Sequence, residues 1–115
     1  MKILFMGSAS FACPALDAIL DEAKNTLVGV VTQPDRPQGR HLEVHACPVK
    51  AHLAGHAAAV LTPEDVNTME SIEAIHDLAP DLIVVVAYGQ ILKPALLQIS
   101  AAGVINLHAS LLPKY

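Results

Sequence analysis

The sequence predicts an α/β fold with a doubly wound, mostly parallel sheet and helices on both of its faces. Short apolar runs alternate along the chain with segments of helical spacing, and the strongest runs contain no polar residue that would face water. Strands that are buried on both faces and joined by helices form parallel sheets, because each helix returns the chain to the end of the sheet where it started. At 115 residues, the chain is expected to form one domain.

The first third of the chain predicts two strands and a helix between them. Ile3–Met6 is a four-residue apolar run that Gly7 ends, which is typical of a strand buried on both faces. Phe11–Ala23 places apolar residues at helical spacing, and Pro14 is tolerated in the first turn. Leu27–Thr32 is rich in β-branched residues and is expected to be the next strand.

The middle of the chain predicts a long connection, a helix and a short strand. Gln33–His45 contains two prolines and a glycine and is expected to be a loop. Loops of this length in compact domains tend to be functional or mobile. Pro48–Ala57 is expected to be a helix with proline at an early position, and Ala58–Leu61 a short strand.

The last third predicts two more helices and two more strands. Met69–Leu78 has an apolar stripe on one side and is expected to be an amphipathic helix. Leu82–Ala87, with the sequence LIVVVA, is apolar on both faces and is expected to be central in the sheet. Pro94–Ile99 predicts a short helix and Val104–His108 the last strand. A Rossmann-like domain normally continues beyond such a strand, so the sheet is expected to be truncated after its fifth strand.

Composition and charge argue against several classes of protein. A 53% apolar and 16% charged composition excludes a disordered chain. The net charge of −4 and the absence of a basic block give little attraction for nucleic-acid phosphates. No apolar run approaches the roughly 18 residues of a membrane helix, and the N-terminus lacks a signal-peptide pattern. A cytoplasmic, soluble protein with reduced cysteines is therefore expected.

The last expected strand carries the strongest candidate site. Because side chains alternate along a strand, Asn106 and His108 share one face with Val104. His108 would lie at the carboxyl end of the strand, where open α/β sheets bind ligands. Two polar groups there suit a site that stabilises charge developing on a carbonyl oxygen. Strand geometry leaves an alternative equally open, in which a buried Asn106 fixes a neighbouring loop and His108 is solvated.

Three other features suggest weaker hypotheses. The turn MGSASFACP offers N–H groups to an anion, but it has only one of the three glycines of a dinucleotide-binding turn. His45, Cys47, His52 and His56 match no zinc-binding spacing, so no metal is expected. Cys13 is expected to be a small core residue rather than a nucleophile, because no basic partner is close in sequence.

The segment VVAYGQILKP places Tyr88 and Gly89 directly after the strand Leu82–Ala87. An irregular apolar segment at this edge of the sheet could receive a flat ring system through its backbone groups. The residues alone favour the alternative, which is an ordinary connection between a strand and a helix.

Five segments resemble, in this order, the N-terminal domain of the methionyl-tRNA formyltransferases, a family of folate-dependent formyltransferases. They are FMGSASFACPAL, VVTQPDRPQGR, ACPVK, DLIVVVAYGQIL and GVINLHASLLPKY. The resemblance covers residues 1–115 as the N-terminal part of the formyltransferase domain. NLHASLLP is specific to folate-dependent formyltransferases as a class, whereas QPDRP, GR and PVK point within that class to enzymes of initiator methionyl-tRNA.

The resemblance implies transfer of a formyl group from 10-formyltetrahydrofolate to the amino group of methionyl-initiator tRNA, in translation initiation. It implies that Asn106 and His108 belong to an Asn–His–Asp catalytic set and hold the formyl oxygen as the amine attacks. It also implies that Arg40, within Gln33–Lys50, contacts the tRNA. The implied folate-binding residues are Ser110, Leu111, Leu112 and Pro113, and, around the pterin ring, Tyr88, Gly89, Gln90, Ile91 and Leu92.

Two departures from the family pattern bear on these expectations. After GR, the family's segment is richer in lysine, whereas this chain has His41, Glu43 and His45, which weakens the expected contacts with tRNA phosphates. The sequence also lacks the family's catalytic aspartate and its tRNA-binding domain, so the 115-residue chain alone is expected to be nearly inactive. Two alternatives stay open: a folate formyltransferase acting on an amino-sugar nucleotide or a ribonucleotide amine, and an inactive folate-binding remnant. The sequence predicts no oligomeric state.

Overall fold

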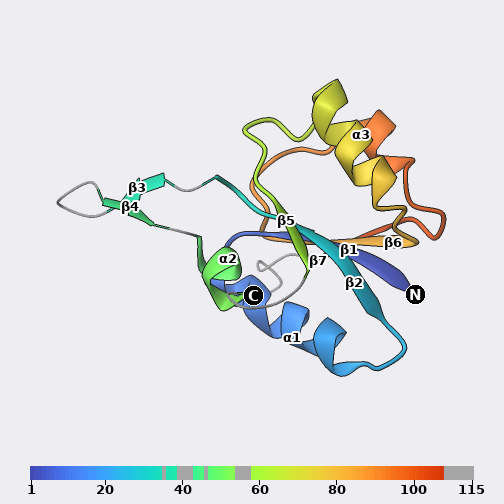
Figure 1. Cartoon of the computed structure of the whole chain (residues 1–115), viewed down its shortest axis with the longest axis horizontal. Helices are drawn as coiled ribbons and strands as arrows, with labels where there is room; N and C mark the ends of the chain where they lie inside the picture. Colours follow the sequence, from blue (N-terminus) through green and yellow to red (C-terminus); the bar gives the residue numbers. More distant parts are fainter. Residues whose placement is uncertain (35, 39–42, 46, 54–57, 108–115) are drawn as a thin grey trace, which may run out of the picture.

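The computed structural model describes residues 1–34, 36–38, 43–45, 47–53 and 58–107. Within these residues, five parallel strands form one sheet in the spatial order β5-β2-β1-β6-β7 (Figure 1). The strands are β1 (Lys2–Gly7), β2 (Thr26–Val31), β5 (Ala59–Leu61), β6 (Leu82–Val86) and β7 (Val104–Leu107). The order confirms the predicted Rossmann-like arrangement, and all five strands overlap the predicted ones.

The strand order contains a point at which the direction of winding reverses. From β1 the chain moves outward through β2 to β5, and it then crosses back to β6 and moves outward to β7 on the other side. The connections that follow β1 and β6 therefore leave toward opposite faces of the sheet. Ligands of open α/β sheets bind in the crevice that this reversal creates at the carboxyl ends of the strands.

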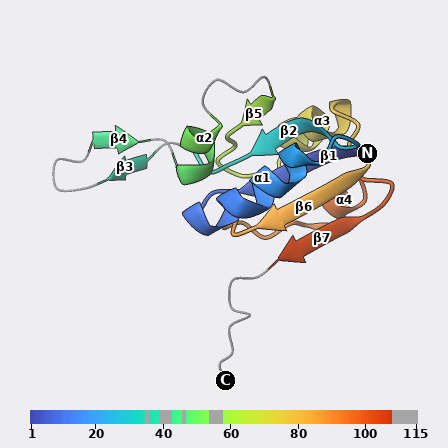
Figure 2. The ribbon, with the colours of Figure 1, turned by 90° about the horizontal axis from the view of Figure 1, so that it is seen from below.

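Helices cover both faces of the sheet, as predicted (Figures 1 and 2). The helices are α1 (Cys13–Asp21), α2 (Pro48–His52), α3 (Met69–Asp77) and α4 (Pro94–Leu97). Proline in the first turn starts α1, α2 and α4, where its missing N–H is not needed for an intrahelical bond. The α3 helix begins instead at a hydroxyl cap, in which Thr68 Oγ1 accepts a hydrogen bond from the Ser71 N–H at 3.2 Å. No helix in the described part of the chain is long and apolar enough to cross a membrane.

Residues of β1 contribute to core layers on both faces of the sheet. Ile3 and Phe5 pack on the side of α1 and α2, whereas Leu4 and Met6 pack on the side of α3 and α4. Side chains alternate along a strand, so an apolar run buried on both faces is what a strand in the middle of a covered sheet requires. β6 is similarly buried on both faces between β1 and β7, which confirms that it is an internal strand.

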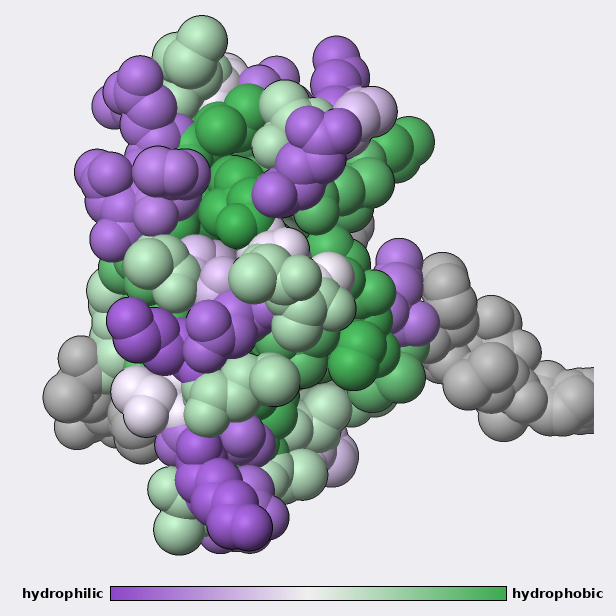
Figure 3. Space-filling model, turned by 90° about the vertical axis from the view of Figure 1, so that its right-hand side faces the viewer, coloured by the Kyte–Doolittle hydropathy of each residue, from purple (hydrophilic) through white to green (hydrophobic). Residues whose placement is uncertain are grey.

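The far edge of the sheet is less well covered. Ile105 and Leu107 of β7 are each 45% exposed, on the face of β7 opposite to Val104 and Asn106. Hydrophobic side chains also reach the surface at several places in the view of Figure 3. β7 is an edge strand within the described residues.

The prediction that Gln33–His45 is a loop was wrong in part. The segment contains β3 (Arg36–Gln38) and β4 (Glu43–His45), which pair antiparallel to each other. Both strands lie away from the main sheet in Figures 1 and 2. Proline did not prevent strand pairing here, because both strands of a two-stranded unit are edge strands, and an edge strand tolerates a residue without an N–H.

Two predicted helices have different bounds in the structure. The first, Phe11–Ala23, divides into a 3-10 turn, η1 (Ser10–Ala12), and the helix α1, which ends at Asp21. The second, Pro48–Ala57, is helical from Pro48 to His52, and residues 54–57 lie outside the described ones.

Candidate active site

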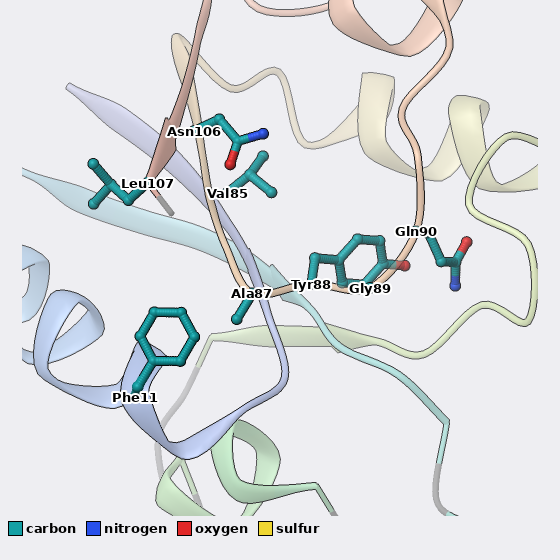
Figure 4. Close-up of a pocket in the computed structure, with 8 residues that line it drawn as sticks. All are labelled: Phe11, Val85, Ala87, Tyr88, Gly89, Gln90, Asn106 and Leu107. Carbon is teal, nitrogen blue, oxygen red and sulfur yellow. The ribbon is translucent and has the colours of Figure 1, made fainter. Parts of the chain in front are cut away.

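A pocket of about 310 Å³ lies at the carboxyl ends of β6 and β7 (Figure 4). It is lined by Phe11, Val85, Ala87, Tyr88, Gly89, Gln90, Asn106 and Leu107. These residues come from η1, from β6 and the loop that follows it, and from β7. The pocket thus brings together Asn106 and Tyr88–Gln90, which the resemblance assigns to one site.

Asn106 lies on β7 directly opposite Val85 of β6, and Figure 4 shows the two side chains next to each other. Within the described residues, the Asn106 side chain is exposed. An exposed amide at the mouth of a pocket can hydrogen-bond a ligand.

The loop after β6 has an unusual backbone. Ala87 has a φ of 52° and Gly89 a φ of 98°, on either side of the buried Tyr88. Positive φ strains an alanine, and such strain persists only where neighbouring groups hold it, often at ligand sites. The φ of Gly89 favours glycine, and a Cβ at position 89 would also lie only 2.7 Å from Gln33 Nε2, so the Gln33 side chain would have to shift.

The Tyr88 hydroxyl is buried and has no hydrogen-bond partner among the described residues. Burial and, to a smaller extent, the Asp65 carboxylate raise its pKa to about 12. The hydroxyl therefore stays protonated and remains a hydrogen-bond donor throughout the physiological pH range.

Side chains from two other loops, after β1 and after β2, form hydrogen bonds with this segment. Gln33 follows β2 and donates a hydrogen bond from Nε2 to the Tyr88 carbonyl at 3.0 Å. Gln90 Nε2 donates to Gln33 Oε1 at 3.2 Å, and Ser8 Oγ accepts from the Gln33 N–H at 3.0 Å. The sequence did not single out Ser8, Gln33 or Phe11, since none interrupts an apolar pattern.

Other predicted site residues lie apart from the pocket or outside the described residues. Ile91 is 85% exposed and Leu92 is half-buried in the core, and neither lines the pocket. The backbone after them is held by Asn67, whose Oδ1 accepts from the Lys93 N–H at 2.9 Å and whose Nδ2 donates to the Ile91 carbonyl at 2.8 Å. The residues outside the described ranges are Arg40, His108, Ser110, Leu111, Leu112 and Pro113.

The histidines and cysteines form no metal site in the part of the chain that the structure describes. His52 Nε2 instead lies 2.8 Å from Asp17 Oδ1, which joins α2 to α1 at the surface. Both cysteines are free thiols. Burial, and then the nearby Asp17 and Cys47, raise the pKa of the Cys13 thiol, whereas a nucleophilic cysteine needs a lowered pKa.

Comparisons with known proteins agree with the fold and the motifs. Residues 1–115 match the family model described as formyl transferase. The methionyl-tRNA formyltransferase of Geotalea daltonii is 50% identical over 115 residues, and that of Trichlorobacter lovleyi is 52% identical over 114 residues. These alignments cover 100% and 99% of this chain, but 36% of each relative, so the chain spans about a third of their length.

A solved structure shows the same fold at low sequence similarity. The crystal structure of phosphoribosylglycinamide formyltransferase from Bacillus halodurans matches with a TM-score of 0.71 and 17% identity. The match covers 100% of this chain and 59% of that one. Because the family model matches residues 1–115, which is the whole of this chain, the chain belongs to the formyl transferase family.

Proposed function

We propose that this chain carries the donor-binding part of an enzyme that transfers a formyl group from 10-formyltetrahydrofolate to the amino group of methionyl-initiator tRNA. The observation that carries the proposal is that Asn106 and Tyr88–Gln90 line one pocket at the carboxyl end of the sheet. Relatives named methionyl-tRNA formyltransferase, at 50% identity, support the choice of acceptor.

The residues that line the pocket fit a folate donor, whose pterin ring is flat and carries hydrogen-bonding groups on its edge. The loop Ala87–Gln90 brings main-chain groups to the pocket, since its positive φ angles turn the backbone there. Phe11 and Leu107, each more than a third exposed, supply apolar contact from the other two elements. Apolar walls with a few fixed polar groups are typical of small-molecule sites.

Asn106 is proposed to act on the reacting group itself. The amine attacks the formyl carbon while the Asn106 amide donates a hydrogen bond to the formyl oxygen. The bond between the formyl carbon and N10 of the folate then breaks, and tetrahydrofolate leaves with the proton that the amine gives up. A hydrogen bond that strengthens as negative charge develops lowers the barrier more than it tightens binding of the ground state. His108, two residues further along, is proposed to assist, and Ser110, Leu111, Leu112 and Pro113 to contact the folate.

The acceptor side of the proposal rests on Arg40 and on domain organisation. Arg40 is proposed to contact the tRNA from the segment that contains β3 and β4. We further propose that residues 1–115 are the N-terminal part of the formyltransferase domain and do not include the family's tRNA-binding domain.

A formyl-transfer assay with the protein expressed from its complete reading frame tests the proposal. 10-Formyltetrahydrofolate is offered with initiator methionyl-tRNA, with an amino-sugar nucleotide or with a ribonucleotide amine. Formylmethionyl-tRNA is expected as the main product. Formylation of one of the nucleotides instead contradicts the acceptor, and the absence of transfer to all three contradicts the proposed function.

A further inference from the structure

Four loops meet at the carboxyl edge of the sheet in one hydrogen-bond network centred on Gln33. The Gln33 main-chain N–H donates to Ser8 Oγ at 3.0 Å, in the loop after β1. Its side-chain Nε2 donates to the Tyr88 carbonyl at 3.0 Å, and its Oε1 accepts from Gln90 Nε2 at 3.2 Å, both in the loop after β6. The main chain of Gln33 therefore contacts a residue 25 positions away, and its half-buried side chain contacts residues 55 and 57 positions away.

Gln90 extends the network to the loop after β5. Its Oε1 accepts from the Val66 N–H at 2.8 Å, and its Nε2 also donates to the Pro63 carbonyl at 3.3 Å. Both glutamine amides thus use their oxygen and their nitrogen in hydrogen bonds. A half-buried amide that is bonded at both ends has one favoured orientation, so the pair fixes the relative position of the loops that it joins.

The network forms hydrogen bonds with residues 87–90, the segment whose backbone is strained. Ala87 and Gly89 both have positive φ, and the Tyr88 carbonyl between them accepts hydrogen bonds from Gln33 Nε2 at 3.0 Å and Ser8 Oγ at 3.4 Å. Gln33 Nε2 also occupies the space that a side chain at position 89 would need. Strained backbone persists where the surrounding structure over-determines it, and Gln33 supplies much of that determination here.

We propose that Gln33 is a positioning residue for the donor pocket. It is not among the residues that line the pocket in the described structure, and it acts through Tyr88 and Gln90, which do line it. This inference rests on the proposed function, since it assigns the pocket to the folate. Gln33 is also the first residue of Gln33–Lys50, the segment expected to contact the tRNA. Its side chain therefore connects the start of that segment to the wall of the donor pocket.

Two isosteric substitutions of Gln33 in the full-length protein test the proposal. Gln33→Met keeps the length of the side chain but removes all its hydrogen bonds. Gln33→Glu keeps the acceptor toward Gln90 but places a carboxylate oxygen against the Tyr88 carbonyl. The dissociation constant of 5-formyltetrahydrofolate, a stable isomer of the donor, is measured by calorimetry, together with kcat and KM for 10-formyltetrahydrofolate.

Loss of positioning is expected to raise the dissociation constant and the KM of the donor roughly five- to tenfold in Gln33→Met, and more in Gln33→Glu. The kcat is expected to fall less, because Asn106 is left in place. Gln98→Met serves as the matched control, since Gln98 is exposed after α4 and outside the network. A role in packing alone would leave both variants close to wild type, because both side chains fill the volume of glutamine.

The outcomes separate the inference from the proposed function. If both Gln33 variants bind the donor with the dissociation constant of the wild type, Gln33 has no positioning role, and the proposed function is unaffected. A wild type that does not bind the folate at all contradicts the proposed function, and the inference with it. Should Gln33→Met fail to fold by circular dichroism, Gln33→Asn, which withdraws the amide by one methylene, is expected to show the same loss of affinity.

Discussion

Among the described residues, Asn106 is the one proposed to act on the reacting group. Its amide lines the pocket, opposite Val85, and is exposed. Asn106→Ala is expected to lower kcat of the full-length protein by about 10²- to 10³-fold, with a smaller effect on donor KM, because it removes a hydrogen bond that strengthens in the transition state. Asn25→Ala, in the turn before β2 at the opposite end of the sheet, is the control. If Asn106→Ala has the kcat of the wild type, Asn106 does not have the proposed role in stabilising the formyl oxygen.

Gly89 offers a test of the loop that forms the wall of the pocket. Gly89→Ala combines a positive φ of 98° with a Cβ that would lie 2.7 Å from Gln33 Nε2. We expect a loss of about 1–3 kcal/mol in the free energy of unfolding, measured by urea denaturation. Gly103→Ala separates the two causes, because Gly103 has a similar φ of 103° but no described atom within 4 Å of the added Cβ. Equal losses at both positions would show that contact with Gln33 does not matter.

Tyr88 is expected to make the free energy of unfolding depend on pH. Its pKa is raised to about 12 in the folded protein, so between about pH 10 and 12 the unfolded chain loses this proton while the folded chain keeps it. Folded protein then binds more protons than unfolded protein, and stability falls as pH rises through this window. Tyr88→Phe is expected to remove this part of the fall, measured as the difference between wild-type and variant unfolding at pH 7 and pH 11.

The same variant tests the unpartnered hydroxyl. At pH 7, Tyr88→Phe is expected to be neutral or to gain up to about 1 kcal/mol, because it removes a buried polar group that forms no hydrogen bond within the described residues. A clear loss of stability at pH 7 would mean that the hydroxyl has a partner.

The sequence pointed to some residues of the site and not to others. Asn106 was predictable because a polar side chain stands out in an apolar strand, although its exposure depends on the strand order, which no local pattern contains. Tyr88–Gln90 entered through the resemblance, since a strand-to-helix connection has no chemical signature of its own. Gln33 was missed, because its role consists of contacts with residues more than fifty positions away.

Among the elements, α3 depends most clearly on one polar contact. Its first turn is capped by Thr68, whose hydroxyl accepts from the Ser71 N–H at 3.2 Å. Thr68→Ala is expected to lower the free energy of unfolding by about 1 kcal/mol, whereas Thr68→Ser keeps the hydroxyl and most of the stability. Urea denaturation measures both, and a Thr68→Ala variant as stable as wild type contradicts the cap.

The strands were predictable where burial on both faces dictates an apolar run. β1 and β6 meet this condition, and the runs Ile3–Met6 and Leu82–Ala87 identified them. β3 and β4 were not predicted, because prolines and a glycine dominate the local pattern of Gln33–His45, whereas the pairing depends on two short segments finding each other. The division of Phe11–Ala23 into η1 and α1 was also not visible in the helical spacing of its apolar residues.

For the molecule as a whole, the net charge of −4 repels the proposed acceptor, tRNA, which is a polyanion. Arg40 is therefore expected to matter more than one charge would in a basic protein. Arg40→Ala in the full-length protein should raise the KM for tRNA and reduce the slope of log KM against log salt concentration by about 1, with donor KM unchanged. Lys24→Ala, in the exposed turn before β2, is the control, and an equal effect of both variants argues against a specific contact.

One pocket, at the carboxyl ends of β6 and β7, is proposed to hold the formyl donor beside Asn106. A crystal structure of the full-length protein with 5-formyltetrahydrofolate tests this claim most directly. We expect the pterin ring against Tyr88–Gln90 and the end of the ligand that carries the formyl group within hydrogen-bond distance of Asn106. A folate bound elsewhere on the molecule, with this pocket left to solvent, would contradict the account.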